Sequence, residues 1–275
     1  MSEFQEGYVP SNGINVHYYR STPPGGGPAV VMLHGITDNG LCWVRVAREL
    51  KNEYDVVMLD ARGHGLSDAP ETGYTPEDRA ADVAGAIDAL QLDRPVLFGH
   101  SMGAETANLT AAMYPEKIRA IILEDPPFNL TPPASPEDQR AAFEAWRANI
   151  MKQKQATREQ LLAAIRAENP GWHEDELGPW VESKLQMSPN LLGVVGNMRP
   201  NWREYSGNIR CPVLLITADP ERGAIIRPDA AQAAASTWKN IRVVRIDGAG
   251  HCIHRDQFEP TMQAVCEFLR EVTPA

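Results

Sequence analysis

The sequence lacks the features of membrane and secreted proteins. No apolar run approaches the roughly 18 to 20 residues that a membrane-spanning helix needs. Residues 1–6 provide neither the basic region nor the apolar region of a secretory signal. The 4 cysteines are scattered, with no Cys-x-x-Cys pair and no zinc-type ligand spacing. We therefore expect a cytoplasmic protein with reduced thiols, no bound metal and no membrane partner.

Positive charge is also scarce. The chain has 26 Lys and Arg residues against 36 Asp and Glu residues, which gives a formal net charge of −10. Such a balance disfavours nucleic acid as a partner. No Gly-x-Gly-x-x-Gly follows the first buried strand, so a dinucleotide site of that type is not expected. We expect a small-molecule substrate and no cofactor. The sequence leaves open whether the protein forms a homodimer.

What the sequence does contain is a regular alternation of short apolar runs and segments of helix length. Continuously apolar runs are typical of parallel strands that helices cover on both faces. Five such runs occupy 29–33, 56–59, 96–98, 120–123 and 213–216, and a further strand is expected at 241–246. The pattern predicts an α/β fold with a mostly parallel sheet flanked by helices.

The N-terminal region predicts a hairpin. Apolar and polar residues alternate from Gly13 to Tyr19, which is typical of a half-buried strand. Asn12-Gly13 is a favoured hairpin turn after Tyr8-Val9. We expect the strand at 13–19 to be an antiparallel edge strand, and the two strands of the hairpin bring the sheet to eight strands.

Residues 126–205 break this alternation. They contain no strand-like run but three amphipathic helical patterns, and they are too long for one crossover helix. We predict a helical cap at 126–205, inserted into a core of residues 1–125 and 206–275. Four of the six tryptophans lie in the cap. Most can be explained as core packing, and we expect Trp146 and Trp180 to line an apolar substrate pocket.

The strongest chemical motif is Gly99-His100-Ser101-Met102-Gly103. It follows the apolar run that ends at Phe98 and precedes an alanine-rich stretch that begins at Ala104. A serine on a sharp turn from strand to helix needs small neighbours, because the chain crowds itself at the apex. The context predicts a nucleophile elbow with Ser101 exposed at its tip.

A serine nucleophile requires a base and an acid that orients the base. His251 follows the last predicted strand through a glycine-rich loop and is the predicted base. His254 is its competitor, and we expect it to be a supporting or surface residue. Asp219 follows the strand at 213–216 and is the predicted acid, with Asp125 after the strand at 120–123 as the alternative.

Two main-chain N–H groups should stabilise the developing oxyanion. The first is that of Met102, directly after the nucleophile. The second is that of Ile36, in the loop after the strand at 29–33, where Gly35 permits a close approach. We expect His34 to brace this loop and to lie at the substrate site, and Asp38 to cap the following helix.

These motifs resemble the α/β-hydrolase superfamily over nearly the whole chain. The resemblance is carried by His34-Gly35, Asp60 to Ser67, the Ser101 pentapeptide, Asp219 and Gly250-His251. It implies the α/β-hydrolase fold and the chain order serine, acid, histidine. Serine at the elbow differs from the aspartate of related epoxide hydrolases and haloalkane dehalogenases. The segments at 34–37 and 99–104 are similar to the N-formylmaleamate deformylase branch.

The predicted activity is that of a serine hydrolase with a Ser101, His251 and Asp219 triad. We expect it to cleave a carboxylic ester or lactone of a small, largely apolar substrate through an acyl-enzyme. The same triad could instead hydrolyse an amide, a formamide or a carbon–carbon bond. The non-catalytic alternative is that the protein has the same fold but only binds a ligand.

Overall fold

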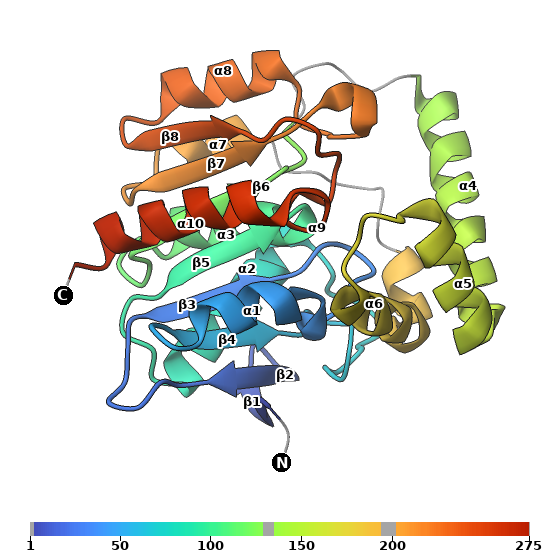
Figure 1. Cartoon of the computed structure of the whole chain (residues 1–275), viewed down its shortest axis with the longest axis horizontal. Coiled ribbons are helices and arrows are strands. Elements are labelled where there is room, and N and C mark those ends of the chain that lie inside the picture. The colour runs from blue at the N-terminus through green and yellow to red at the C-terminus, as the bar shows by residue number, and fades with distance from the viewer. Residues whose placement is uncertain (1–2, 129–134, 194–201, 275) are drawn as a thin grey trace.

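The computed structural model describes residues 3–128, 135–193 and 202–274. A single twisted sheet runs through the molecule, and helices lie on both of its faces (Figure 1). The sheet has eight strands in the order β1-β2-β4-β3-β5-β6-β7-β8. The strands are β1 (Gln5–Ser11), β2 (Ile14–Ser21), β3 (Ala29–Leu33), β4 (Asp55–Leu59), β5 (Val96–His100), β6 (Ala120–Glu124), β7 (Val213–Thr217) and β8 (Ile241–Arg245).

The predicted mostly parallel sheet is confirmed. Strands β3 to β8 run parallel, and β2 is antiparallel to both β1 and β4. The strand expected at 13–19 is therefore not at the edge, because β1 forms seven residue pairs with it and is itself the edge strand. Every residue of β3 to β7 is buried, which explains why these runs carry no polar alternation.

Two apolar layers separate the sheet from its helices. One layer joins the sheet to α1 and α10, and the other joins it to α2, α3 and α8. The helices of the core are α1 (Val44–Leu50), α2 (Pro76–Ala89), α3 (Met102–Met113), α8 (Pro228–Thr237), α9 (Ile253–Asp256) and α10 (Phe258–Val272), with 3-10 turns η1 (Gly40–Trp43) and η3 (Pro220–Arg222). The sheet is thus covered on both faces, and its strand ends are left for loops that carry polar residues.

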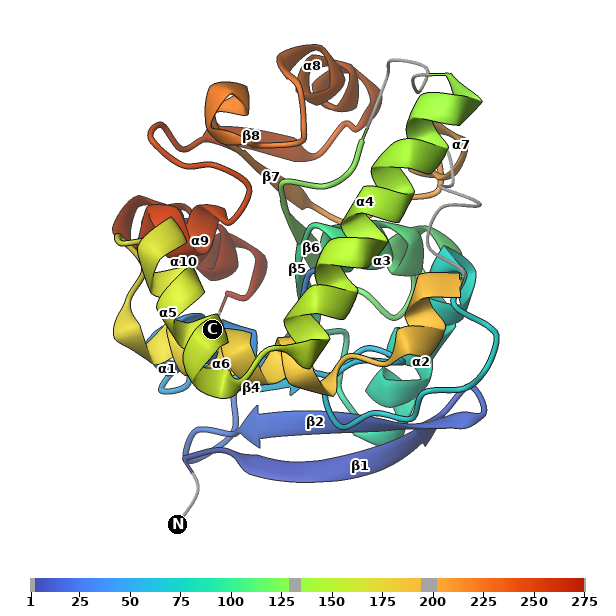
Figure 2. The same cartoon turned by 90° about the vertical axis from the view of Figure 1, so that its right-hand side faces the viewer.

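The three amphipathic patterns of the predicted cap form helices. They are α4 (Pro136–Gln155), α5 (Arg158–Glu168) and α6 (Glu174–Gln186), and a 3-10 turn η2 (Pro189–Gly193) follows. Figure 1 shows α4, α5 and α6 together on one side of the molecule, and Figure 2 shows that side facing the viewer. In the described ranges, no helix has both the length and the apolar character that crossing a membrane would require.

The short helix α7 (Trp202–Ser206) packs differently from the rest of the predicted cap. Its Trp202 ring stacks on Phe128, with centroids 5.0 Å apart, and meets the edge of Trp238 at 5.6 Å. These rings belong to the apolar layer beside α2, α3 and α8. Trp202 therefore contributes to the core, although the sequence places it in the cap.

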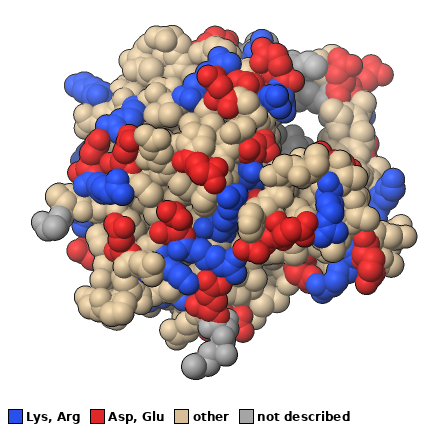
Figure 3. Space-filling model, in the orientation of Figure 1, with Lys and Arg blue, Asp and Glu red and all other residues tan. Residues whose placement is uncertain are grey.

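The face of the molecule seen in Figure 3 carries charged side chains of both signs. Figure 3 shows acidic and basic side chains intermixed across the visible face, including the junction between the cap and the core. Several of these charges are paired across elements. One example is Arg48, which contacts both Glu3 at the N-terminus and Asp175 in α6.

Candidate active site

Ser101 occupies a strained turn between β5 and α3. Its backbone angles are φ 53° and ψ −115°, a region that non-glycine residues rarely adopt. A Cβ atom at Gly99 would collide with the carbonyl of Gly103, and one at Gly103 would collide with the carbonyl of Leu33. The glycines flanking the serine are therefore required sterically, as the sequence predicts for an elbow.

His251 lies in the loop after β8, and its partner is Asp125. The Nδ1 atom is 2.6 Å from Asp125 Oδ2. The Asp125 carboxylate is fully buried and also accepts the N–H groups of Ile225 at 2.8 Å and Ile226 at 2.9 Å. A carboxylate with three donors around it acts as an acceptor, so the His251 proton sits on Nδ1. The Nε2 atom is then free to accept a proton.

The prediction that Asp219 orients His251 is wrong. The Asp219 carboxylate instead accepts the N–H of Gly248 at 2.8 Å and a guanidinium N–H of Arg245 at 2.8 Å. The bond from Gly248, followed by the bond from Arg245, lowers the pKa of Asp219. Because β6 lies between β5 and β7, the loop after β6 is one strand nearer to the elbow than the loop that carries Asp219.

His100 connects the elbow to the His251 loop. Its Nε2–H donates to the main-chain oxygen of His251 at 2.8 Å, and the two rings are 4.7 Å apart. Burial lowers the pKa of His100 to about 3, so the ring is neutral at ordinary pH. The sequence offers no signal for this contact, because His100 there is only a neighbour of the serine.

His254 is buried as a supporting residue. Its Nδ1 lies 2.9 Å from each carboxylate oxygen of Glu124, and its ring stacks on Trp43 with centroids 4.5 Å apart. The side chain is only 2% exposed. His254 is therefore enclosed under the His251 loop, and the surface placement considered for it is wrong.

The loop after β3 approaches the elbow closely. A Cβ atom at Gly35 would lie 2.8 Å from His100 Nδ1 and 3.5 Å from Ser101 Cβ. Met102 begins α3, where main-chain N–H groups have no acceptor within the helix. Among the described residues, no hydrogen bond uses the N–H of Ile36. Met102 thus directly follows Ser101 in the chain, and the loop that carries Ile36 lies against the elbow, so both N–H groups remain candidate oxyanion donors.

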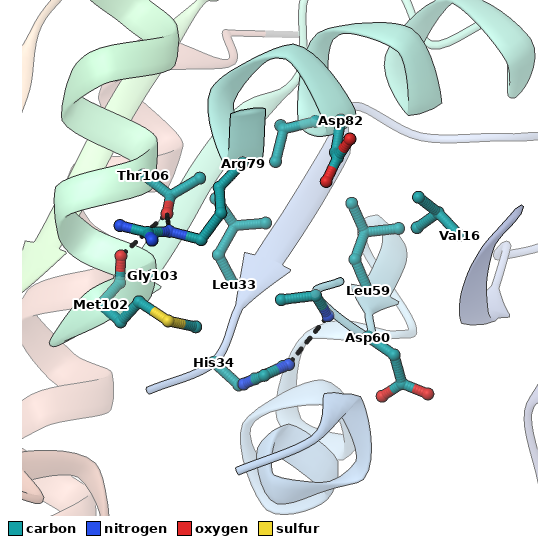
Figure 4. Close-up of a pocket in the computed structure, with 12 residues that line it drawn as sticks. Val16, Leu33, His34, Leu59, Asp60, Arg79, Asp82, Met102, Gly103 and Thr106 are labelled. Carbon is teal, nitrogen blue, oxygen red and sulfur yellow. Dashed lines mark hydrogen bonds between the residues drawn. The ribbon is translucent and has the colours of Figure 1, made fainter. Parts of the chain in front are cut away.

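His34 braces this loop through both of its ring nitrogens. The Nδ1–H donates to the carbonyl of Gly35 at 2.8 Å. The Nε2 atom accepts the N–H of Ala61 at 3.0 Å (Figure 4). Burial lowers the pKa of His34, in keeping with a neutral ring. The predicted bracing role is confirmed. A substrate contact is not supported, because neither ring nitrogen is left for one.

A small cavity lies between the loop after β3 and α3, and neither Ser101 nor His251 lines it. Its volume is about 30 Å³, which suits a single water molecule. Figure 4 shows Arg79 reaching Thr106 in this space. Arg79 Nε donates to Thr106 Oγ1 at 3.2 Å, and the Thr106 hydroxyl donates to the carbonyl of Met102 at 2.9 Å. The cavity wall therefore supports the first turn of α3.

The cap is joined to the loop after β3 by a buried ion cluster. Lys184 of α6 donates to Asp38 Oδ1 at 2.8 Å and to the carbonyl of Thr37 at 2.9 Å, while Arg255 donates to Asp38 Oδ2 at 2.9 Å. Burial raises the pKa of Asp38, but the charges of Lys184 and Arg255 outweigh it and hold the pKa well below its usual range. The expected capping by Asp38 is wrong, because Asn39 occupies that cap position.

The two tryptophans predicted at the substrate pocket have different surroundings. Trp146 of α4 packs with Ile36 against an apolar cluster of Tyr74, Ile150, Met187 and Leu191. Trp180 is 9% exposed and lies in a separate core between α5 and α6, with Lys184 Nζ 4.7 Å from its ring. Trp146 and Ile36 therefore pack against the same apolar cluster, whereas Trp180 lies in the interior of the cap.

Comparisons with known proteins agree with this architecture. The family model described as "alpha/beta hydrolase fold" matches residues 28–257. The chain is 30% identical over 264 residues to 2-(acetamidomethylene)succinate hydrolase of Mesorhizobium japonicum, covering 89% of each chain. It is 31% identical over 268 residues to N-formylmaleamate deformylase of Pseudomonas putida, covering 96% of each chain. The crystal structure of E-2-(acetamidomethylene)succinate hydrolase superposes with a TM-score of 0.82 at 25% identity, covering 97% of this chain and 99% of the other. The chain belongs to the α/β-hydrolase fold family and is a hydrolase.

Proposed function

We propose that the chain is a serine hydrolase in which Ser101 is the nucleophile, His251 the base and Asp125 the acid. The observation that carries this proposal is the 2.6 Å bond between His251 and the buried Asp125 carboxylate, next to the strained turn at Ser101. The acid does not accept the proton. It holds the imidazole in the required tautomer and stabilises the imidazolium that forms.

The reaction proceeds in two acyl-transfer steps. His251 Nε2 removes the proton of Ser101 Oγ as this oxygen attacks the substrate carbonyl carbon. The N–H groups of Met102 and Ile36 stabilise the oxyanion. His251 then gives its proton to the leaving group, and the acyl group remains on Ser101. Water repeats the sequence and releases the acid.

We propose an amide of a short acyl group as the substrate class. Support comes from the names of the two relatives above, one of which is a deformylase and the other a hydrolase of an acetamido compound. Ile36 and Trp146 are partly buried against one apolar cluster, and they would offer apolar surface to a short acyl group. Esters, which the sequence favours, should also react, because an alkoxide leaves more readily than an amine.

A matched panel of N-formyl, N-acetyl and O-acetyl compounds tests both the mechanism and the bond. We expect Ser101→Ala to lose turnover of every member of the panel and to lose labelling by a fluorophosphonate probe. Ser236→Ala, on the exposed face of α8, is the control and should keep both. Full turnover by Ser101→Ala would contradict the mechanism, and selective turnover of the esters alone would contradict the proposed amide substrate.

A further inference from the structure

A single carboxylate bridges the cap and the loop that carries His251. Asp256 of α9 accepts the N–H of Gly250 through Oδ2 at 2.7 Å. Its other oxygen, Oδ1, accepts the indole N–H of Trp172 at 2.8 Å. Trp172 lies in the turn between α5 and α6, and Gly250 directly precedes His251. The cap is therefore two hydrogen bonds away from the main chain of the proposed base.

The loop around Gly250 has little freedom to adapt if this bridge is lost. A Cβ atom at Gly250 would collide with the carbonyl of Arg222. On the N-terminal side, Gly248 has φ +79° and donates to Asp219. On the C-terminal side, the carbonyl of His251 accepts from His100. Between these two anchors the carbonyl of Ala249 accepts the N–H of Asp219 at 3.1 Å, and Asp256 holds Gly250.

Trp172 is itself held firmly. The Arg255 guanidinium lies 4.8 Å from the Trp172 ring, and Arg255 also donates to the buried Asp38. Asp38 in turn accepts from Lys184 of α6. Two of the contacts that fasten the pair of helices α5 and α6 to the core therefore lie beside the loop after β3 and beside the His251 loop.

We infer that Trp172 and Asp256 are positioning residues through which the cap orients His251. The inference rests on the proposed function, in which His251 is the base. Displacement of α5 and α6 would loosen Gly250 and lengthen the contact between His251 and Asp125. The cap would thus control the alignment of the base as well as access to the nucleophile.

Trp172→Phe tests the inference because it removes the indole N–H but keeps a ring over Arg255. The bridge lines an open groove of about 470 Å³, so a smaller ring leaves no enclosed void. The matched control is Trp238→Phe, which removes an indole bond of 3.1 Å to Ser206 on the opposite part of the core. Each variant loses one indole hydrogen bond.

Two readouts distinguish positioning from general stability. The downfield proton NMR resonance of the His251–Asp125 hydrogen bond, assigned by its loss in His251→Ala, should move upfield or broaden in Trp172→Phe and Asp256→Ala. In the same variants kcat should fall about tenfold, with KM nearly unchanged. Asp256→Asn keeps one acceptor oxygen and should lose less than Asp256→Ala.

The inference is overturned if Trp172→Phe and Asp256→Ala keep the wild-type resonance and kcat. It is also overturned if Trp238→Phe changes both readouts to the same extent, because the effect would then be general loosening. The NMR readout reports the His251–Asp125 contact whether or not the panel compounds are hydrolysed. Failure of the proposed function and failure of this inference therefore give different results.

Discussion

The Nδ1 atom of His251 and the Oδ2 atom of Asp125 lie 2.6 Å apart although 126 positions separate the two residues in the chain. The contact depends on the strand order, which places β6 directly beside β5. Asp125 itself has φ 43° and donates its N–H to the carbonyl of Ile216, so the turn after β6 is held against β7. The acid is thereby presented from the strand next to the nucleophile.

Gly35→Ala should reduce activity more than stability. The added methyl group would lie 2.8 Å from His100 Nδ1, which is too close, so the loop that carries Ile36 must move away from the elbow. Loss of one oxyanion donor costs about 10²- to 10³-fold in kcat, and we expect a loss in this range. Steady-state kinetics together with thermal unfolding measures both effects.

The matched control is Gly178→Ala in α6, where a Cβ atom would meet nothing within 4 Å. It should leave kcat unchanged and stabilise the protein by about 0.5 to 1 kcal/mol, because alanine favours a helix over glycine. Unchanged kcat in Gly35→Ala would show that this loop does not supply an oxyanion donor.

Lys184→Met should destabilise the protein by about 3 kcal/mol. The substitution leaves the buried Asp38 carboxylate with Arg255 as its remaining charged partner, and breaking a buried pair is far more costly than breaking an exposed one. Urea unfolding measures the change. Lys117→Met removes an exposed pair with Asp88 and should cost less than about 1 kcal/mol. Equal losses in the two variants would contradict the structural role of the Lys184 cluster.

His64 makes the stability of the protein depend on pH in the acid range. Its Nδ1–H donates to the carbonyl of Arg62 at 2.9 Å, and its Nε2 accepts the N–H of Thr37 at 3.3 Å. Burial lowers the pKa of His64 from 6.5 to about 3. Between these values the unfolded chain binds the proton and the folded chain does not, so stability is lost as the pH falls from about 6.5 toward 3.

His64→Gln keeps an acceptor for Thr37 and removes the titration. We expect its free energy of unfolding to depend less steeply on pH than that of the wild type over this interval, even if its stability at pH 7 is lower. Urea unfolding at a series of pH values measures the slope. Identical slopes would show that protonation of His64 does not contribute.

The sequence was sufficient to predict what local patterns determine. Continuous apolar runs identified the parallel strands, and Asn12-Gly13 identified the hairpin turn that joins β1 to β2. The two glycines around Ser101 identified the elbow, because only glycine avoids the collisions found there. These features depend on neighbours in the chain.

The parts that the sequence could not predict depend on contacts between distant segments. Asp125 and Asp219 both follow parallel strands, and only the loop paths decide which one meets His251. The bridge from Trp172 through Asp256 spans 84 positions, and Lys184 lies 146 positions from Asp38. No local pattern marks such pairs, because each residue is an ordinary polar or aromatic side chain in its own segment.

The most direct test of the proposed triad compares kcat/KM of Asp125→Asn and Asp219→Asn on the same substrate. Asn at 125 keeps the geometry but cannot hold the required tautomer and imidazolium, so kcat/KM should fall about 10³- to 10⁴-fold. Asn at 219 still accepts a hydrogen bond from Gly248, so kcat/KM should fall less than about tenfold. A larger loss in Asp219→Asn than in Asp125→Asn would contradict the assignment of Asp125 as the acid.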